Sequence, residues 1–82
     1  MDYIQHVTEI RAELNQLEAQ AEELGPQSSV DTKIDIGFAR DLLNEVERGE
    51  ISAEEAADAA LQRANMALPG PAQDALRAVA YG

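Results

Sequence analysis

The chain has 82 residues, of which sixteen are Asp or Glu and six are Lys or Arg, giving a net charge of −10 at neutral pH. This charge works against direct binding to DNA, RNA or an anionic membrane, because the few basic residues are scattered and cannot balance the acidic ones near phosphates. Cysteine is absent, which excludes disulfides and thiolate sites. No apolar run approaches the ~20 residues of a membrane span, and no signal-peptide pattern begins the chain. We therefore expect a single cytoplasmic domain over residues 1–82.

The first predicted element is a helix over about residues 2–24, ended by Gly25 and Pro26. Its apolar residues follow the alternating four-then-three spacing of coiled-coil core positions. They are Tyr3, Val7, Ile10, Leu14, Leu17, Ala21 and Leu24. A stripe this narrow needs a partner helix, and we expect these seven residues to mediate self-association.

The charges beside this heptad seam indicate how two copies would pair. A parallel dimer would place Glu13 against Glu18, which is repulsive, and His6 against Arg11. An antiparallel arrangement brings Arg11 near Glu18 of the other helix. The pattern therefore disfavours a parallel dimer and favours either an antiparallel homodimer or packing of this helix within its own chain. Both arrangements can coexist.

Residues 25–35 are expected to form a linker, because Pro26, Gln27, Ser28 and Ser29 are typical of turns. The next predicted helix covers about residues 36–48. Its apolar residues spread over more than half of its circumference, so we expect it to be the central element. Asp35 should cap its start. If the helix began earlier, this carboxylate would instead lie on the apolar face and need a partner.

Two shorter helices are predicted over about residues 52–67 and 71–80. Gly49 fits a helix C-terminus, and Ser52 with Glu55 fits the capping box that starts the next helix. The first of the two should pack through a mostly alanine face. That face comprises Ala53, Ala57, Ala60, Leu61, Ala64 and Leu68. Pro71 suits the first position of the last helix. Near the start of helix 36–48, Gly37 is costly and suggests a close backbone contact. The class is all-α, a small bundle of three to four helices.

No pattern of side chains predicts catalysis, a metal site or a cofactor. His6, Glu9 and Glu13 share a helix face, but di-iron bundles require Glu-x-x-His on two helices, and the order here is reversed. A calcium loop beginning at Asp31 fails because Lys33 stands at its third position. With one histidine, no cysteine and no phosphate-binding loop, the sequence does not predict an enzyme.

The sequence instead favours a non-enzymatic interaction protein that self-associates and binds a basic protein partner through its acidic faces. The expected contact residues are Glu9, Glu13, Asp41, Glu45, Glu54 and Asp58. In size and charge the chain also resembles phage-encoded inhibitors of bacterial defence complexes, among them anti-CRISPR proteins. That resemblance implies that the same carboxylates replace phosphates in a basic groove. A binder of a small ligand between subunits is a third reading.

Overall fold

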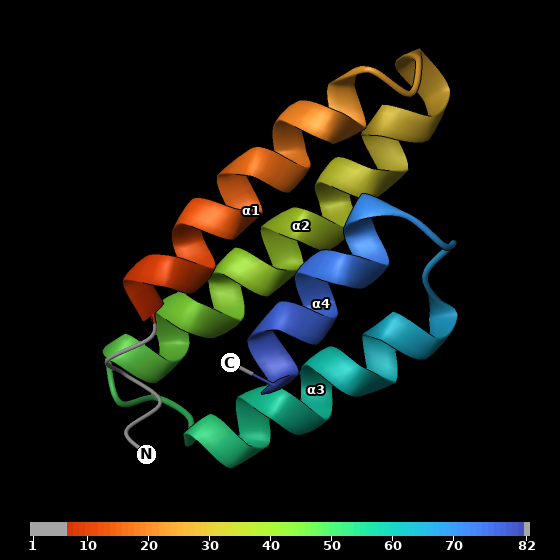
Figure 1. Cartoon of the computed structure of the whole chain (residues 1–82). Helices are drawn as coiled ribbons and strands as arrows, with labels where there is room; N and C mark the ends of the chain where they lie inside the picture. The colour runs from red at the N-terminus through yellow and green to blue at the C-terminus, as the bar shows by residue number, and fades with distance from the viewer. Residues whose placement is uncertain (1–6, 82) are drawn as a thin grey trace.

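This computed structural model describes residues 7–81, without the side chains of residues 26–29. Four α-helices make up this part of the chain. Successive helices run in opposite directions (Figure 1). Their bounds are α1 Val7–Glu22, α2 Pro26–Glu47, α3 Ala53–Met66 and α4 Pro71–Tyr81. The described residues contain no strand, which confirms the all-α class and the small helical bundle.

The heptad seam of α1 packs inside its own chain. Its side chains at five of the seven predicted positions are buried against α2 and α4. These are Val7, Ile10, Leu14, Leu17 and Ala21. Leu24 follows the end of α1 and is 53% exposed, whereas Tyr3 and the predicted helix start lie outside the described residues. The seam therefore takes the intrachain arrangement, and self-association through it stays a prediction without an exposed stripe to support it.

The prediction of a linker over residues 25–35 is wrong, because α2 begins at Pro26 and contains nearly all of that stretch. Glu23, Leu24 and Gly25 form the short turn between α1 and α2, and Gly25 has φ +103°, a conformation that glycine adopts without steric cost. Proline then fits the first helical position, since its ring fixes φ near the helical value and its missing N–H has no partner there anyway. The turn-like composition therefore marks a helix start.

The centre of the bundle is shared by α2 and α4, which each pack against all three other helices. The sequence predicted this role for the second helix alone. In α4 the side chains of Ala75, Leu76 and Val79 have no exposed surface. The short last helix is thus a central part of the core, and it lies between α1 and α3 (Figure 1).

The packing face of α3 is shifted from the predicted one. Ala56, Ala60 and Ala64 form the buried row, spaced four residues apart, and let α4 approach closely. Leu68 was expected on this face but is 77% exposed. The reason is that α3 ends at Met66 and the backbone after it is extended, which carries Leu68 away from the core.

The short connection between α2 and α3 has the predicted capping residues. Gly49 has φ +74°, its N–H donates to the Val46 carbonyl, and the Glu50 N–H donates to the Glu45 carbonyl. These two bonds define a Schellman motif. Ser52 then caps α3, with its hydroxyl oxygen accepting from the Glu55 N–H at 3.1 Å. Local sequence therefore sets this boundary.

Candidate partner-binding surface

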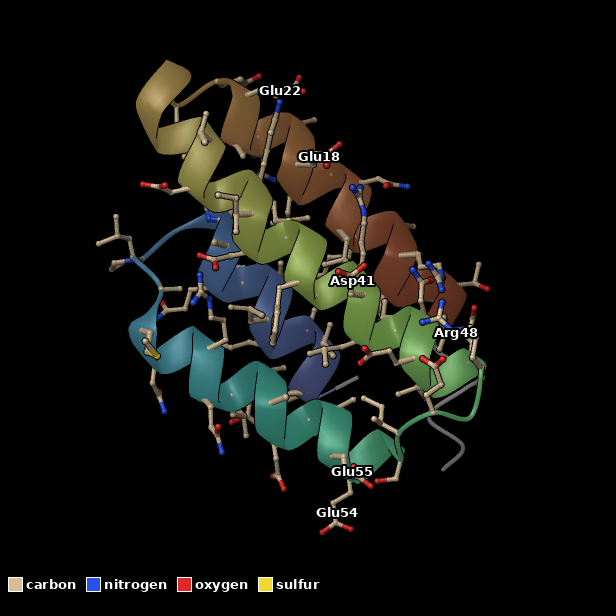
Figure 2. The ribbon with its side chains drawn as sticks, turned by 180° about the vertical axis from the view of Figure 1, so that it is seen from behind. Glu18, Glu22, Asp41, Arg48, Glu54 and Glu55 are labelled. Atoms are coloured by element: carbon tan, nitrogen blue, oxygen red, sulfur yellow. The ribbon has the colours of Figure 1, made fainter. Side chains whose placement is uncertain are left out.

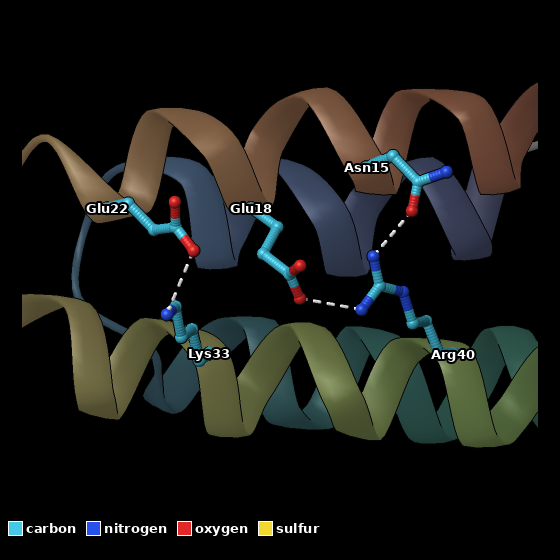
Figure 3. A network of polar contacts seen from close by, with 5 residues as sticks. All are labelled: Asn15, Glu18, Glu22, Lys33 and Arg40. Atoms are coloured by element: carbon cyan, nitrogen blue, oxygen red, sulfur yellow. Dashed lines mark hydrogen bonds and ion pairs between the residues drawn. The ribbon is translucent and has the colours of Figure 1, made fainter.

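Polar contacts between α1 and α2 hold two basic side chains along one edge of the bundle (Figure 3). The Lys33 Nζ lies 3.1 Å from Glu22 Oε1. The guanidinium of Arg40 lies 2.6 Å from Glu18 Oε2 and also donates to Asn15 Oδ1 at 2.6 Å. These contacts join two helices that the short turn at Gly25 already brings together. The positive charges of Lys33 and Arg40 are therefore balanced by carboxylates of the same chain.

Arg11 repeats this arrangement near the other end of the two helices. Its Nη2 donates to Asn44 Oδ1 at 2.6 Å and lies 2.9 Å from Glu47 Oε2. The antiparallel dimer predicted from the sequence would bring Arg11 near Glu18 of a second chain. The observed partner lies on α2 of the same chain, so this arginine does not support an antiparallel dimer.

Asp35 is a buried carboxylate, and its predicted role as a helix cap is wrong. Because α2 begins at Pro26, Asp35 lies in the middle of the helix with 7% of its surface exposed. Arg63 of α3 contacts its Oδ1 through Nε and Nη2, each at 2.6 Å. The expected consequence of an earlier helix start, a carboxylate on the apolar face that needs a compensating charge, is what the structure shows, and Arg63 of the same chain supplies that charge. This ion pair joins α2 to α3.

Arg48 is held by Glu50 at 2.9 Å, just beyond the end of α2. The hydrogen bond and the charge of Glu50 raise the pKa of Arg48, and the carboxylates of Glu45 and Asp41 raise it further. Among the described residues there are five ion pairs, each with a different basic side chain. These pairs are neutral as units, so the net charge of −10 belongs to the remaining side chains.

The six predicted contact carboxylates lie on three helices and do not form a single face. Each helix carries two of them four residues apart, on its outer side: Glu9 and Glu13 on α1, Asp41 and Glu45 on α2, Glu54 and Asp58 on α3. All are exposed except Glu45, which is partly buried. Since α2 and α4 lie between α1 and α3 (Figure 1), the α1 and α3 pairs are carried by helices that are separated in the bundle. The six carboxylates are therefore spread over three helices.

The first turn of α3 carries two exposed acidic side chains. Figure 2 shows Glu54 and Glu55 pointing outward from its first turn. Their negative charge there is favourable, since the N-terminus of a helix carries partial positive charge. Helix capping and the helix dipole are therefore sufficient to explain why these two residues are acidic, and no binding partner is needed to explain them. The carboxylates of α2 have no such local explanation.

The outer face of α2 carries apolar side chains that sequence reasoning missed. Val30 is 57% exposed, Ile34 59% and Phe38 38%. Spaced four residues apart, they form one row, which continues into Asp41 and Glu45. We call these five residues the α2 ridge. Val30 and Ile34 lie in the stretch that the sequence predicted as a linker. Their four-residue spacing with Phe38 is typical of one face of a helix and would have identified the row.

A pocket of about 470 Å³ lies beside the first half of α2. It is lined by residues from the α1–α2 turn, from α2, from the α3–α4 connection and from the start of α4. These are Leu24, Asp31, Thr32, Asp35, Leu68, Pro69, Gly70, Pro71 and Ala72. The third reading of the sequence placed a small-ligand site between subunits, whereas this pocket is formed by one chain.

Two classes of feature are absent from residues 7–81. No group of three or more His, Asp or Glu side chains there could hold a metal ion. No helix in this part of the chain is long and apolar enough to cross a membrane. His6, which shares a predicted helix face with Glu9 and Glu13, lies outside the described residues.

No family model, curated protein or solved structure matches the chain, so its function must be argued from its own residues.

Proposed function

We propose that this chain is a non-enzymatic binding module for a basic protein partner. One observation carries the proposal: five of the six basic side chains are held by the chain's own carboxylates within the described residues. Carboxylates outside these pairs then dominate the outer surface. Such a field attracts a positively charged partner and repels nucleic acid and anionic lipid.

Within this surface, Asp41 and Glu45 on α2 are the carboxylates that we expect to contribute most to binding a basic partner. Asp41 is exposed, and neither it nor Glu45 belongs to the five ion pairs. The nearby guanidinium of Arg48 is held by Glu50. Lysine or arginine side chains of a partner would therefore meet two carboxylates whose charges act on Arg48 from a distance, while Arg48 itself is ion-paired with Glu50 and not with them. Exposed charge pairs of this kind add little affinity each, but they raise the association rate and select the partner.

A titration with a lysine-rich helical peptide tests the proposal. We expect binding by isothermal titration calorimetry in about 0.05 M salt, and at least about tenfold weaker binding in about 0.5 M salt, because salt screens exposed charges. A peptide of equal length with glutamine in place of lysine is the matched control. Absence of binding at low salt, or equal binding of the control, would contradict the proposal.

A phage-type inhibitor that replaces nucleic acid in a basic groove is the second candidate. Its support is the presence of carboxylate pairs on the outer sides of neighbouring helices, α2 and α3. A groove that engages these two pairs would meet the third pair only if it also reached α1, which α2 and α4 separate from α3 (Figure 1). Competition between this chain and nucleic acid for a basic channel would distinguish this function from ordinary partner binding.

Self-association, expected from the sequence, would have to use another surface than the heptad seam. Five of the seven seam residues are part of the core of one chain. A second copy would instead have to cover exposed apolar side chains such as those of α2. The two copies would also have to overcome the repulsion between net charges of −10 each.

A further inference from the structure

We infer that the α2 ridge (Val30, Ile34, Phe38, Asp41 and Glu45) docks an amphipathic helix of a partner, with apolar residues in one half and lysine or arginine in the other. This inference rests on the proposed function and assigns it a surface and a partner chemistry. The ridge runs from Val30 to Glu45, sixteen residues, over about 22 Å or four helical turns. Its first half is apolar and its second half is acidic.

The ridge is the face of α2 that the rest of the chain leaves uncovered. One side of α2 contributes Lys33, Arg40 and Asn44 to the contacts with α1. The opposite side contributes Asp35 to the ion pair with α3. The inner side carries the core residues, among them Ile36 and Leu43, which have no exposed surface. The ridge residues lie between these two sides, facing away from the core.

Two of the three apolar ridge residues, Val30 and Ile34, have no explanation within the fold. Ile34 and Val30 leave more than half of their surface in water. Both are β-branched, and such residues are poorer helix formers than the alanine, lysine or glutamate that an exposed position would accept. Neither local helix stability nor core packing therefore favours them. A row of exposed apolar residues spaced four apart is the pattern by which one helix receives another.

The acidic half of the ridge selects among possible occupants. Two whole ridges in antiparallel contact would place the carboxylates of each copy on the apolar half of the other, which is costly. In parallel contact, Asp41 and Glu45 of the two copies would face each other and repel. A helix with apolar residues over Val30, Ile34 and Phe38 and cations over the carboxylates matches both halves. Charge complementarity therefore favours a basic partner over a second copy.

Synthetic peptides of one composition test this match. Each helical peptide carries three leucines and three lysines on one face. In the first the leucines precede the lysines, the second is its reversed sequence, and in the third they alternate. The reversed sequence covers the antiparallel docking direction. We expect one of the two segregated peptides to bind at least about tenfold more tightly than the alternating one, with amide shifts centred on the ridge.

Two variants locate the contact. Ile34→Asp should weaken binding of the tighter peptide about tenfold, because it places a charge in the apolar half. Met66→Asp is the matched control, since Met66 is 77% exposed on α3 and is not part of the ridge, and it should leave the affinity unchanged. Circular dichroism of both variants serves to check that they remain folded.

The outcomes separate this inference from the proposed function. If no lysine peptide binds at low salt, both fail. If all three peptides bind equally and Ile34→Asp changes nothing, the inference is wrong and the proposed function stands. If the chain alone doubles its molar mass on concentration and Ile34→Asp restores the monomer, a second copy occupies the ridge and the inference is overturned.

Discussion

Replacing Arg63 by methionine should destabilise the chain far more than replacing Asp35 by asparagine, although both changes break the same ion pair. The Asp35 side chain is 10% exposed and the Arg63 side chain 41%. Without Arg63, a buried carboxylate loses its partner, which costs about 3–5 kcal/mol at a fully buried site. Since water reaches the arginine side of this pair, we expect about 2 kcal/mol for Arg63→Met. Asp35→Asn leaves an arginine that can reach water, so its expected cost is about 1 kcal/mol or less.

The free energy of unfolding is measured by urea denaturation followed by circular dichroism. A loss of 2 kcal/mol should also lower Tm by about 8–16 °C in a domain of this size. The double replacement Asp35→Leu with Arg63→Met removes both charges and should return to within about 1 kcal/mol of the natural chain. Lys33→Met is the exposed control, with an expected cost of about 0.5 kcal/mol or less. Equal losses for Arg63→Met and Lys33→Met would refute the claim that Asp35 depends on Arg63.

Three further changes test the helices, each by the same denaturation measurement. Gly37→Ala should stabilise the chain by about 0.5–1 kcal/mol, since alanine is the better helix former. The new Cβ has room, because no atom of a neighbouring element lies within 4 Å of its position. A loss of stability would contradict this prediction. Ser52→Ala should cost about 1 kcal/mol by removing the α3 cap, whereas Ser52→Asn should be nearly neutral, and equal effects would exclude a capping role. Ala60→Leu should cost about 1–3 kcal/mol through overpacking, because Ala60 has no exposed surface where α3 meets α4; a neutral result would mean that the two helices are not closely packed there.

The ends of the helices were predictable wherever the determining residues lie next to each other in the sequence. Ser52, Gly49 and Pro71 act on their own neighbours, and the structure has them at the expected boundaries. The start of α2 was missed because proline after glycine is compatible with a linker and with a first helical turn. Tertiary packing of the segment that follows decides between the two.

The features that were missed depend on residues distant in the sequence. Nothing around Asp35 indicates that Arg63, 28 residues away, supplies its partner. Gly37 was read as a sign of close backbone approach, and no neighbouring element approaches it. The apolar half of the ridge was missed for a related reason, since assigning Val30 and Ile34 to a linker hid their spacing with Phe38.

The heptad seam shows what a hydrophobic pattern alone can predict. The spacing of its residues correctly required a partner surface, but it carries no information on which helix provides that surface. Here α2 and α4 of the same chain provide it. The acidic contact residues were predicted as exposed from their helix positions, whereas their distribution over separate sides depends on how the helices are arranged.

The central claim is that the α1 seam closes the chain's own core and leaves the outer faces for a partner, and Leu14→Glu tests it most directly. Leu14 has no exposed surface. A charge there should cost about 5 kcal/mol or more, comparable with the stability of a small domain. The measurement is thermal melting by circular dichroism together with the molar mass by light scattering. We predict that cooperative melting is lost. A variant that melts like the natural chain but has a lower molar mass would show that the seam joins separate chains.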